Sequence, residues 1–327
     1  MEKIIRFQQL INSEIEKLSS SAQQPKELYD PISYTLSLGG KRMRPLLVLL
    51  GSDLFDGEPE QAISLALGIE LFHNFTLIHD DIMDNAPLRR SKEAVHKKWS
   101  PNIAILSGDA MLVKAYEHVS KTDKAKLPLL LNLFNETAIK VCEGQQLDMN
   151  YEQATTVSIP QYLKMIELKT AVLLAGALKM GAIVAGADEE ESQRLYAFGR
   201  NIGIAFQLQD DILDVYGDEN KFGKQKGGDI ISNKKTWLLL KALDMTKQNH
   251  YKFEELNMWL NASVAAAKEK VEAVTAIYDG LNVLELAKME MMRYYEMGLK
   301  QLSGIKAAES KKQDLITFVN GLITREI

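Results

Sequence analysis

Residues 78–84 read Ile-His-Asp-Asp-Ile-Met-Asp, and residues 209–214 read Gln-Asp-Asp-Ile-Leu-Asp. Both stretches contain the pattern Asp-Asp-x-x-Asp, and both lie within apolar residues at helical spacing. On a helix, the first and last carboxylates of this pattern lie one turn apart on the same face, about 6 Å along the axis. The sequence therefore predicts two helices that each present paired carboxylates.

Three carboxylates within five residues indicate a bound cation. Such carboxylates repel one another, and their burial is costly without a positive charge. Oxygen ligands without His or Cys suit Mg²⁺, which commonly binds through one or two carboxylates and substrate phosphates. A solvated helix face explains a single cluster equally well, but two copies in the same register favour a metal site. Two clusters that face each other would form a negative cavity that holds cations and accepts a polyanion.

Basic residues lie close to both acidic patterns. Residues 39–45 read Gly-Gly-Lys-Arg-Met-Arg-Pro, and Arg89-Arg90 follow the first acidic pattern by a few positions. A segment with four lysines, residues 222–236, follows the second. Exposed backbone amides and guanidinium groups suit phosphate oxygens. The glycines match neither a P-loop nor a dinucleotide fingerprint, because the spacing and the preceding strand are missing.

Composition limits the class of protein. The chain has 327 residues, of which 46% are apolar and 25% are charged, and its net charge is −5. This balance argues against a general nucleic-acid or anionic-membrane binder. A lone cysteine, Cys142, excludes an intrachain disulfide and is expected to be a small buried residue. Residues 1–18 are charged throughout and lack the apolar run of a signal peptide, so a cytoplasmic protein is expected.

Helical periodicity extends along almost the whole chain. Pro31 is expected to open a helix that ends at Gly39-Gly40, and Pro45 lies near the start of the next one. Residues 170–187 are predicted to form a buried core helix rather than a membrane span, because Lys179 lies near their middle. No strand pattern, repeat or linker is present. The sequence predicts one all-α domain over residues 1–327, with ten or more helices. Longer helices are predicted over residues 60–84, 103–120, 127–149, 159–187, 192–215, 234–245, 281–302 and 311–323.

In combination, these motifs resemble the trans-isoprenyl diphosphate synthases, or polyprenyl synthetases, in order over about residues 30–245. Residues 39–45 resemble the family's segment for isopentenyl diphosphate (IPP), and the two acidic patterns resemble its two aspartate-rich motifs. Gly144-Gln145-Gln146-Leu147-Asp148 and Lys169-Thr170 also match. The resemblance implies the isoprenoid synthase fold, with helices around a deep apolar cavity, and a homodimer.

The resemblance also implies roles for single residues. The IPP diphosphate would be held by Lys41, Arg44, His73 and Arg90. Three Mg²⁺ ions would be held by Asp80, Asp84 and Asp210, assisted by Asp81 and Asp214. The allylic diphosphate would contact Arg89, Lys169, Lys224 and Lys234. Thr170 and Gln207 would lie near the developing carbocation, with Gln145 and Asp148 in support. His79 is expected to be structural.

The implied reaction joins IPP head to tail to an allylic diphosphate after metal-assisted ionisation of the allylic C–O bond. A class I terpene cyclase shares the ionisation step but usually carries an Asn/Ser/Glu-type second motif. A helical phosphohydrolase would normally include His ligands, and a non-catalytic synthase subunit would be expected to lose one acidic motif. Both motifs are intact in this sequence.

Product length is predicted from the residues before the first motif. Phe75 lies five positions before Asp80, and Thr76 lies four before it. An aromatic residue followed by a small one resembles the synthases of twenty-carbon geranylgeranyl diphosphate, with fifteen-carbon farnesyl diphosphate as the alternative. At about 100° per residue, Phe75 lies off the Asp80 face, whereas Thr76 and Phe72 lie closer to it. Phe72 is therefore a second candidate for the floor of the cavity.

Overall fold

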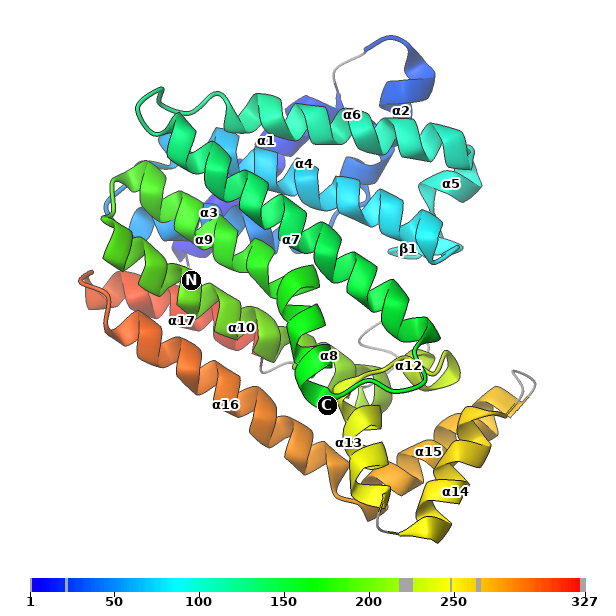
Figure 1. Cartoon of the computed structure of the whole chain (residues 1–327). Helices are drawn as coiled ribbons and strands as arrows, with labels where there is room; N and C mark the ends of the chain where they lie inside the picture. The colour runs from blue at the N-terminus through cyan, green and yellow to red at the C-terminus, as the bar shows by residue number, and fades with distance from the viewer. Residues whose placement is uncertain (1, 21–22, 218–225, 248, 263–265, 324–327) are drawn as a thin grey trace. The chain divides into compact units, whose positions relative to one another are not determined.

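The computed structural model describes residues 2–20, 23–217, 226–247, 249–262 and 266–323. In these ranges the chain is helical almost throughout (Figure 1). The strands of this part are β1 (Leu88–Arg89) and β2 (Lys92–Glu93), which form a short antiparallel hairpin with Leu88 opposite Glu93. The all-α class predicted from the sequence is confirmed.

The chain divides into two compact units. The first comprises residues 1–136, 176–196 and 305–318, and the second comprises residues 137–175, 197–304 and 319–327. Four of the five boundaries fall within helices, namely α7 (Leu127–Gln153), α9 (Val172–Ala185), α10 (Glu189–Tyr216) and α17 (Glu309–Ile323), and the fifth lies just before α17. The single domain expected from the sequence stays a prediction, and each unit is described by itself.

Helix α4 (Pro59–Met83) is central to the first unit. It packs against α1 (Glu2–Ser19), α3 (Met43–Leu54), α5 (Val95–Lys98) and α6 (Pro101–Val119), while α2 (Lys26–Ser37) packs on α1 and α6. Its mean composition is strongly apolar, and its buried positions occur on all sides of the helix. A helix that is apolar all round is stable only inside a protein or a membrane. Packing on several sides therefore fixes the end of α4, where the first acidic motif lies.

A buried ion pair joins the basic segment of residues 39–45 to α4. Arg42 lies just before α3 with a positive φ of 47°, and its guanidinium donates to Glu70 at 2.6 Å and to the carbonyl of Leu36. Asn74 donates to the same Glu70 carboxylate at 3.0 Å. Arg42 and Glu70 are both buried. The middle cation of this segment therefore holds α2, α3 and α4 together and is structural.

The second unit is built around α13 (Trp237–Thr246). This helix packs against α8 (Ile159–Ile166), α14 (His250–Leu260), α15 (Ala267–Gly280) and α16 (Val283–Ser303), and α15 also packs against the short α12 (Gly228–Ile231). The turn η1 (Glu167–Ala171) is π-helical and joins α8 to α9. A π-helical turn is wider than an α-helical one, so the side chains of η1 point in different directions than they would in a continuous α-helix.

Several sequence expectations differ from the structure. Pro31 lies inside α2, which begins after Pro25, so one backbone hydrogen bond is missing within that helix. Cys142 is exposed on α7 rather than buried. Helices α14 and α15 lie beyond the motifs, in a region where no helix was predicted.

Two helical runs are long and apolar enough to cross a membrane by length and composition, residues 59–83 and 159–185. In their most apolar windows, 61% and 83% of the residues are buried inside the protein. The interpretation of residues 170–187 as a buried core helix agrees with this burial.

Candidate active site

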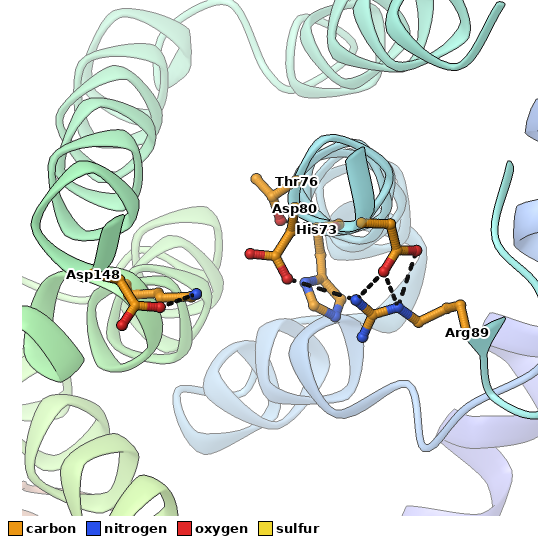
Figure 2. Close-up of polar contacts among 7 residues, drawn as sticks. His73, Thr76, Asp80, Arg89 and Asp148 are labelled. Atoms are coloured by element: carbon orange, nitrogen blue, oxygen red, sulfur yellow. Dashed lines mark hydrogen bonds and ion pairs between the residues drawn. The ribbon is translucent and has the colours of Figure 1, made fainter. Parts of the chain in front are cut away.

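The first acidic motif lies at the C-terminal end of α4. Asp80 and Asp81 are in the last turn, and Asp84 follows the helix and donates its backbone N–H to the carbonyl of Asp80 at 2.9 Å. Figure 2 shows Asp80 on α4 together with His73 and Thr76, which lie seven and four positions earlier. The C-terminal end of a helix carries partial negative charge, and the last turn of α4 contains no basic residue. These carboxylates therefore need positive charge from another source.

Asp81, the middle carboxylate, is buried and bound to an arginine. Arg89 donates from Nε to both oxygens of Asp81, at 2.9 and 3.1 Å, and Nη2 adds a further hydrogen bond to the same carboxylate. Nη2 also lies 3.5 Å from Asp80 (Figure 2). Burial raises the pKa of Asp81 even though the Arg89 guanidinium opposes this shift. The structure thus pairs two residues that the sequence analysis assigned to a metal ion and to the allylic diphosphate.

Three residues assigned to the IPP diphosphate gather in the first unit. Arg44 Nη1 lies 3.0 Å from His73 Nε2, and the guanidinium of Arg90 lies directly against the backbone of Gly40. Arg90 has a positive φ of 52° in the tight turn between β1 and β2. Burial lowers the pKa of His73 well below its usual value, and the neighbouring arginines lower it further, so His73 is neutral and accepts from Arg44. Lys41 is exposed next to this group. This cluster suits an anion with several oxygens.

The second acidic motif lies near the C-terminal end of α10, where the last turn again contains no basic residue. Asp210 and Asp214 are half-buried, as expected for two residues on one helical face. Asp214 Oδ2 accepts the backbone N–H of Asp229 at 3.0 Å, which docks α12 onto the motif. Lys234 follows α12 and donates its backbone N–H to the carbonyl of Asp229 at 2.9 Å. The backbone of Lys234 is thereby bonded to Asp229, which is itself bonded to the second motif.

The π-helical turn η1 positions two further predicted residues. Lys169 Nζ donates to Asp148 on α7 at 2.6 Å (Figure 2), and the Thr170 hydroxyl donates to Gln207 Oε1 on α10 at 3.3 Å. Gln145 lies on the same helix as Asp148 and is half-buried. Gly144 allows this approach, because a Cβ atom there would lie only 2.2 Å from the backbone nitrogen of Lys169.

Two residues of the second unit were missed in the sequence analysis. Asp211 is buried and accepts hydrogen bonds from Tyr162 and Gln207. The sequence pattern could have predicted that Asp211 is buried, because on a helix residue 211 lies about 100° from residue 210 and so faces away from the side that residues 210 and 214 share. No sequence signal pointed to Tyr162. Lys224 lies outside the described residues, and His79 contacts the carbonyl of Ile105 at 3.2 Å.

Comparison with known proteins places the chain in a family. The sequence matches the polyprenyl synthetase family over residues 25–301, which is most of the chain. The chain therefore belongs to the polyprenyl synthetase family. It is an enzyme of the trans-prenyltransferase class, and the resemblance seen in its motifs is confirmed.

Individual relatives agree with this assignment. A crystal structure of a geranylgeranyl pyrophosphate synthase is 42% identical, superposes with a TM-score of 0.93 and covers 99% of both chains. The geranylgeranyl diphosphate synthase of Methanosarcina mazei is 35% identical over 93% of this chain and 91% of its own length. The geranylfarnesyl diphosphate synthase of Natronomonas pharaonis is 40% identical over 68% of this chain and 70% of its own length. The isoprenoid synthase fold predicted from the sequence is confirmed.

The contact between α7 and η1 predicts the effect of one added methyl group. Gly144→Ala should destabilise the protein by about 1–3 kcal/mol, because backbone atoms of Lys169 must move to admit the Cβ atom. It should also lower prenyltransferase activity, because the Lys169–Asp148 contact is displaced. Urea unfolding and initial rates measure the two effects. Gly280→Ala is the matched control, since a Cβ atom there meets no atom within 4 Å. Equal stability of the two variants would contradict the close contact.

Proposed function

We propose that this protein condenses IPP head to tail with an allylic diphosphate and releases geranylgeranyl diphosphate. One observation carries the proposal: two acidic motifs lie near the C-terminal ends of two helices, and each lies in a unit that also contains cations suited to a diphosphate. In the first unit these cations are Arg44 and Arg90, beside neutral His73. In the second unit they are Lys169 and Lys234.

The donor set fits Mg²⁺. In the described part of the chain, no three His, Cys, Asp or Glu side chains converge as a metal cage. Mg²⁺ commonly takes only one or two carboxylates and completes its coordination with phosphate oxygens and water. We therefore propose that Asp80 and Asp84 in the first unit, and Asp210 and Asp214 in the second, bind Mg²⁺, with three ions in all as the family resemblance implies. When bound, the metal supplies positive charge for the departing diphosphate.

The proposed reaction gives each group of residues one task. Lys169 and Lys234 hold the allylic diphosphate and stabilise the negative charge that develops as its C–O bond breaks. Arg44, Arg90 and His73 hold IPP so that its double bond attacks the allylic carbocation, with Lys41 beside them. The new bond forms between carbon atoms, and a proton then leaves to the released pyrophosphate, so no side chain is needed as a base. The Thr170 and Gln207 oxygens would face the carbocation, and the apolar cavity that the family resemblance implies would exclude water from it.

The substrates of this proposal are two small diphosphates, and no nucleic acid is involved. A cytoplasmic location stays a prediction. Farnesyl diphosphate remains the alternative product, while a terpene cyclase and a non-catalytic subunit are disfavoured by two intact acidic motifs in a chain of this family.

The direct test is incubation of the purified protein with Mg²⁺, labelled IPP and each allylic primer in turn. We expect prenyl diphosphate formation that a chelator abolishes. Asp80→Asn and Asp210→Asn should each lower kcat by about 10²–10³-fold or more, because preorganised charge stabilisation of the transition state is lost. Asp109→Asn and Asp244→Asn, on exposed positions, are the controls and should keep wild-type rates. Full Mg²⁺-dependent turnover in the first two variants would defeat the mechanism.

Aromatic packing on α4 supports a product-length role for Phe75. Its ring lies 5.7 Å from that of Phe72 and 4.7 Å from that of His79, and the Phe72 ring lies 5.4 Å from Phe134. Thr76 lies on the Asp80 side of the helix and donates its hydroxyl to the carbonyl of His73 at 2.8 Å (Figure 2). We propose that Phe75, backed by Phe72, limits the product to twenty carbons, while Thr76 leaves room beside Asp80.

Removal of the Phe75 ring should lengthen the product. We expect Phe75→Ala to form prenyl diphosphates longer than twenty carbons, because the growing chain gains the volume of the ring. Chromatography of the dephosphorylated prenols measures the distribution. Phe55→Ala, which removes a ring after α3 in the same unit, should leave the distribution unchanged. An unchanged distribution for Phe75→Ala would move the limit to Phe72.

We also propose a homodimer whose interface includes the exposed apolar side chains of α6. Leu106 and Val113 lie seven positions apart, on one helical face, and are 60% and 61% exposed. Ile105 and Leu129 lie in the same unit and are 44% and 49% exposed. Several large exposed apolar side chains within one unit are consistent with a protein interface.

A charge on this surface should prevent association. Leu106→Glu combined with Val113→Glu should give a monomer, because a dimer would bury two carboxylates in each apolar surface. Light scattering coupled to size-exclusion chromatography measures the mass. Met289→Glu, at a 68% exposed position on α16, is the control and should keep the wild-type mass. A wild-type mass for the double variant would place the interface elsewhere.

A further inference from the structure

Tyr162 is a buried phenol whose hydroxyl donates to Asp211 Oδ2. Burial raises the pKa of Tyr162 well above its usual value, and the nearby Asp211 carboxylate raises it further. The phenol is therefore protonated and acts as a hydrogen-bond donor. It lies on α8, and the carboxylate lies on α10, so the contact joins two helices of the second unit.

The same carboxylate binds the start of α13. Trp237 is the first residue of α13, and its backbone N–H donates to Asp211 Oδ2 at 3.4 Å. The first N–H groups of a helix lack partners within the helix, and negative charge is favourable there. Lys234 lies three positions before Trp237. Asp211 thus anchors the segment that carries a proposed ligand of the allylic diphosphate.

The other oxygen of Asp211 orients an amide. Gln207 Nε2 donates to Asp211 Oδ1 at 3.3 Å, and Gln207 Oε1 accepts from the Thr170 hydroxyl at 3.3 Å. The Gln207 amide nitrogen therefore points to Asp211 Oδ1, while the other oxygen of Asp211 accepts from Tyr162 and Trp237. The amide oxygen of Gln207 then faces Thr170. This orientation presents the negative end of the amide dipole, which suits a site where positive charge develops.

We propose that Tyr162 is a positioning residue for the prenyl transfer, because its hydroxyl fixes the one carboxylate that both orients Gln207 and anchors the segment of Lys234. The inference rests on the proposed function. In this proposal Tyr162 acts through its hydrogen bond to Asp211 and not by touching substrate or metal. Asp211 is likewise proposed to position other residues, whereas Asp210 and Asp214 are the carboxylates proposed to bind Mg²⁺.

Tyr162→Phe tests this inference, since it removes only the hydroxyl. A hydrogen bond to a charged group is worth about a ten- to hundredfold change in rate. We expect kcat to fall by about that factor, while KM for IPP stays within about twofold, because the cluster assigned to IPP lies in the first unit. Mg²⁺ with inorganic pyrophosphate should also raise the melting temperature of Tyr162→Phe less than that of the wild type. Tyr295→Phe, which breaks a phenol–amide contact between Tyr295 on α16 and Asn320 on α17, is the matched control and should behave as the wild type.

A double-mutant cycle tests the route through Asp211. If Tyr162 acts through this carboxylate, Tyr162→Phe should have little further effect in an Asp211→Asn background. Additive effects would overturn the inference, as would a wild-type kcat for Tyr162→Phe, whether or not its melting temperature falls. A wild-type protein without prenyl transfer activity would instead overturn the proposed function. The two failures are therefore distinguished by the wild-type rate.

Discussion

The placement of carboxylates near the C-terminal ends of α4 and α10 is the constraint on which the site depends. A helix already carries partial negative charge at this end, and neither helix offers a basic residue in its last turn. Positive charge from outside the helix is therefore stabilising there: Arg89 supplies it to Asp81 and, at 3.5 Å, to Asp80, and Mg²⁺ is proposed to add to it at both motifs. Carboxylates clustered at the negative end of a helix are a physical reason to expect a positively charged ligand.

The surrounding packing has to hold these helix ends still. In the first unit, the buried pair of Arg42 and Glu70 joins the basic segment to the middle of α4, three residues before His73. Breaking such a pair leaves an uncompensated buried charge, so the segment cannot easily detach. In the second unit, Gly144 lets α7 approach η1 closely enough for Lys169 to reach Asp148. In both units, packing of the backbone fixes where the cationic side chains begin.

Much of this could be predicted from the sequence, because the information was local. Helical periodicity and the acidic spacing gave the fold class, the long helices and the helices of both motifs. The sequence could not separate Arg42 from Arg44: Arg42 is buried because of its contact with Glu70, twenty-eight residues further along the chain, whereas Arg44 is half-buried. Pro31 was expected to open a helix, but the packing of α2 on α1 and α6 outweighs the bond that the proline removes. Cys142 was expected inside, yet it lies on an exposed face of α7, which a single small residue cannot signal.

The middle aspartate of each motif shows the same limit most clearly. Asp81 and Asp211 occupy equivalent places in the pattern, and both are buried, as their angle from the paired carboxylates requires. Their partners differ in kind and in distance along the chain: Arg89 lies eight residues from Asp81, and Tyr162 lies forty-nine from Asp211. A charged partner binds the first carboxylate directly, whereas the side chains that donate hydrogen bonds to the second are neutral. Burial and then the Asp229 carboxylate raise the pKa of Asp211 to about 7, although Lys234 opposes this shift. Identical patterns therefore carry two different electrostatic solutions, and only the tertiary structure decides which one each motif receives.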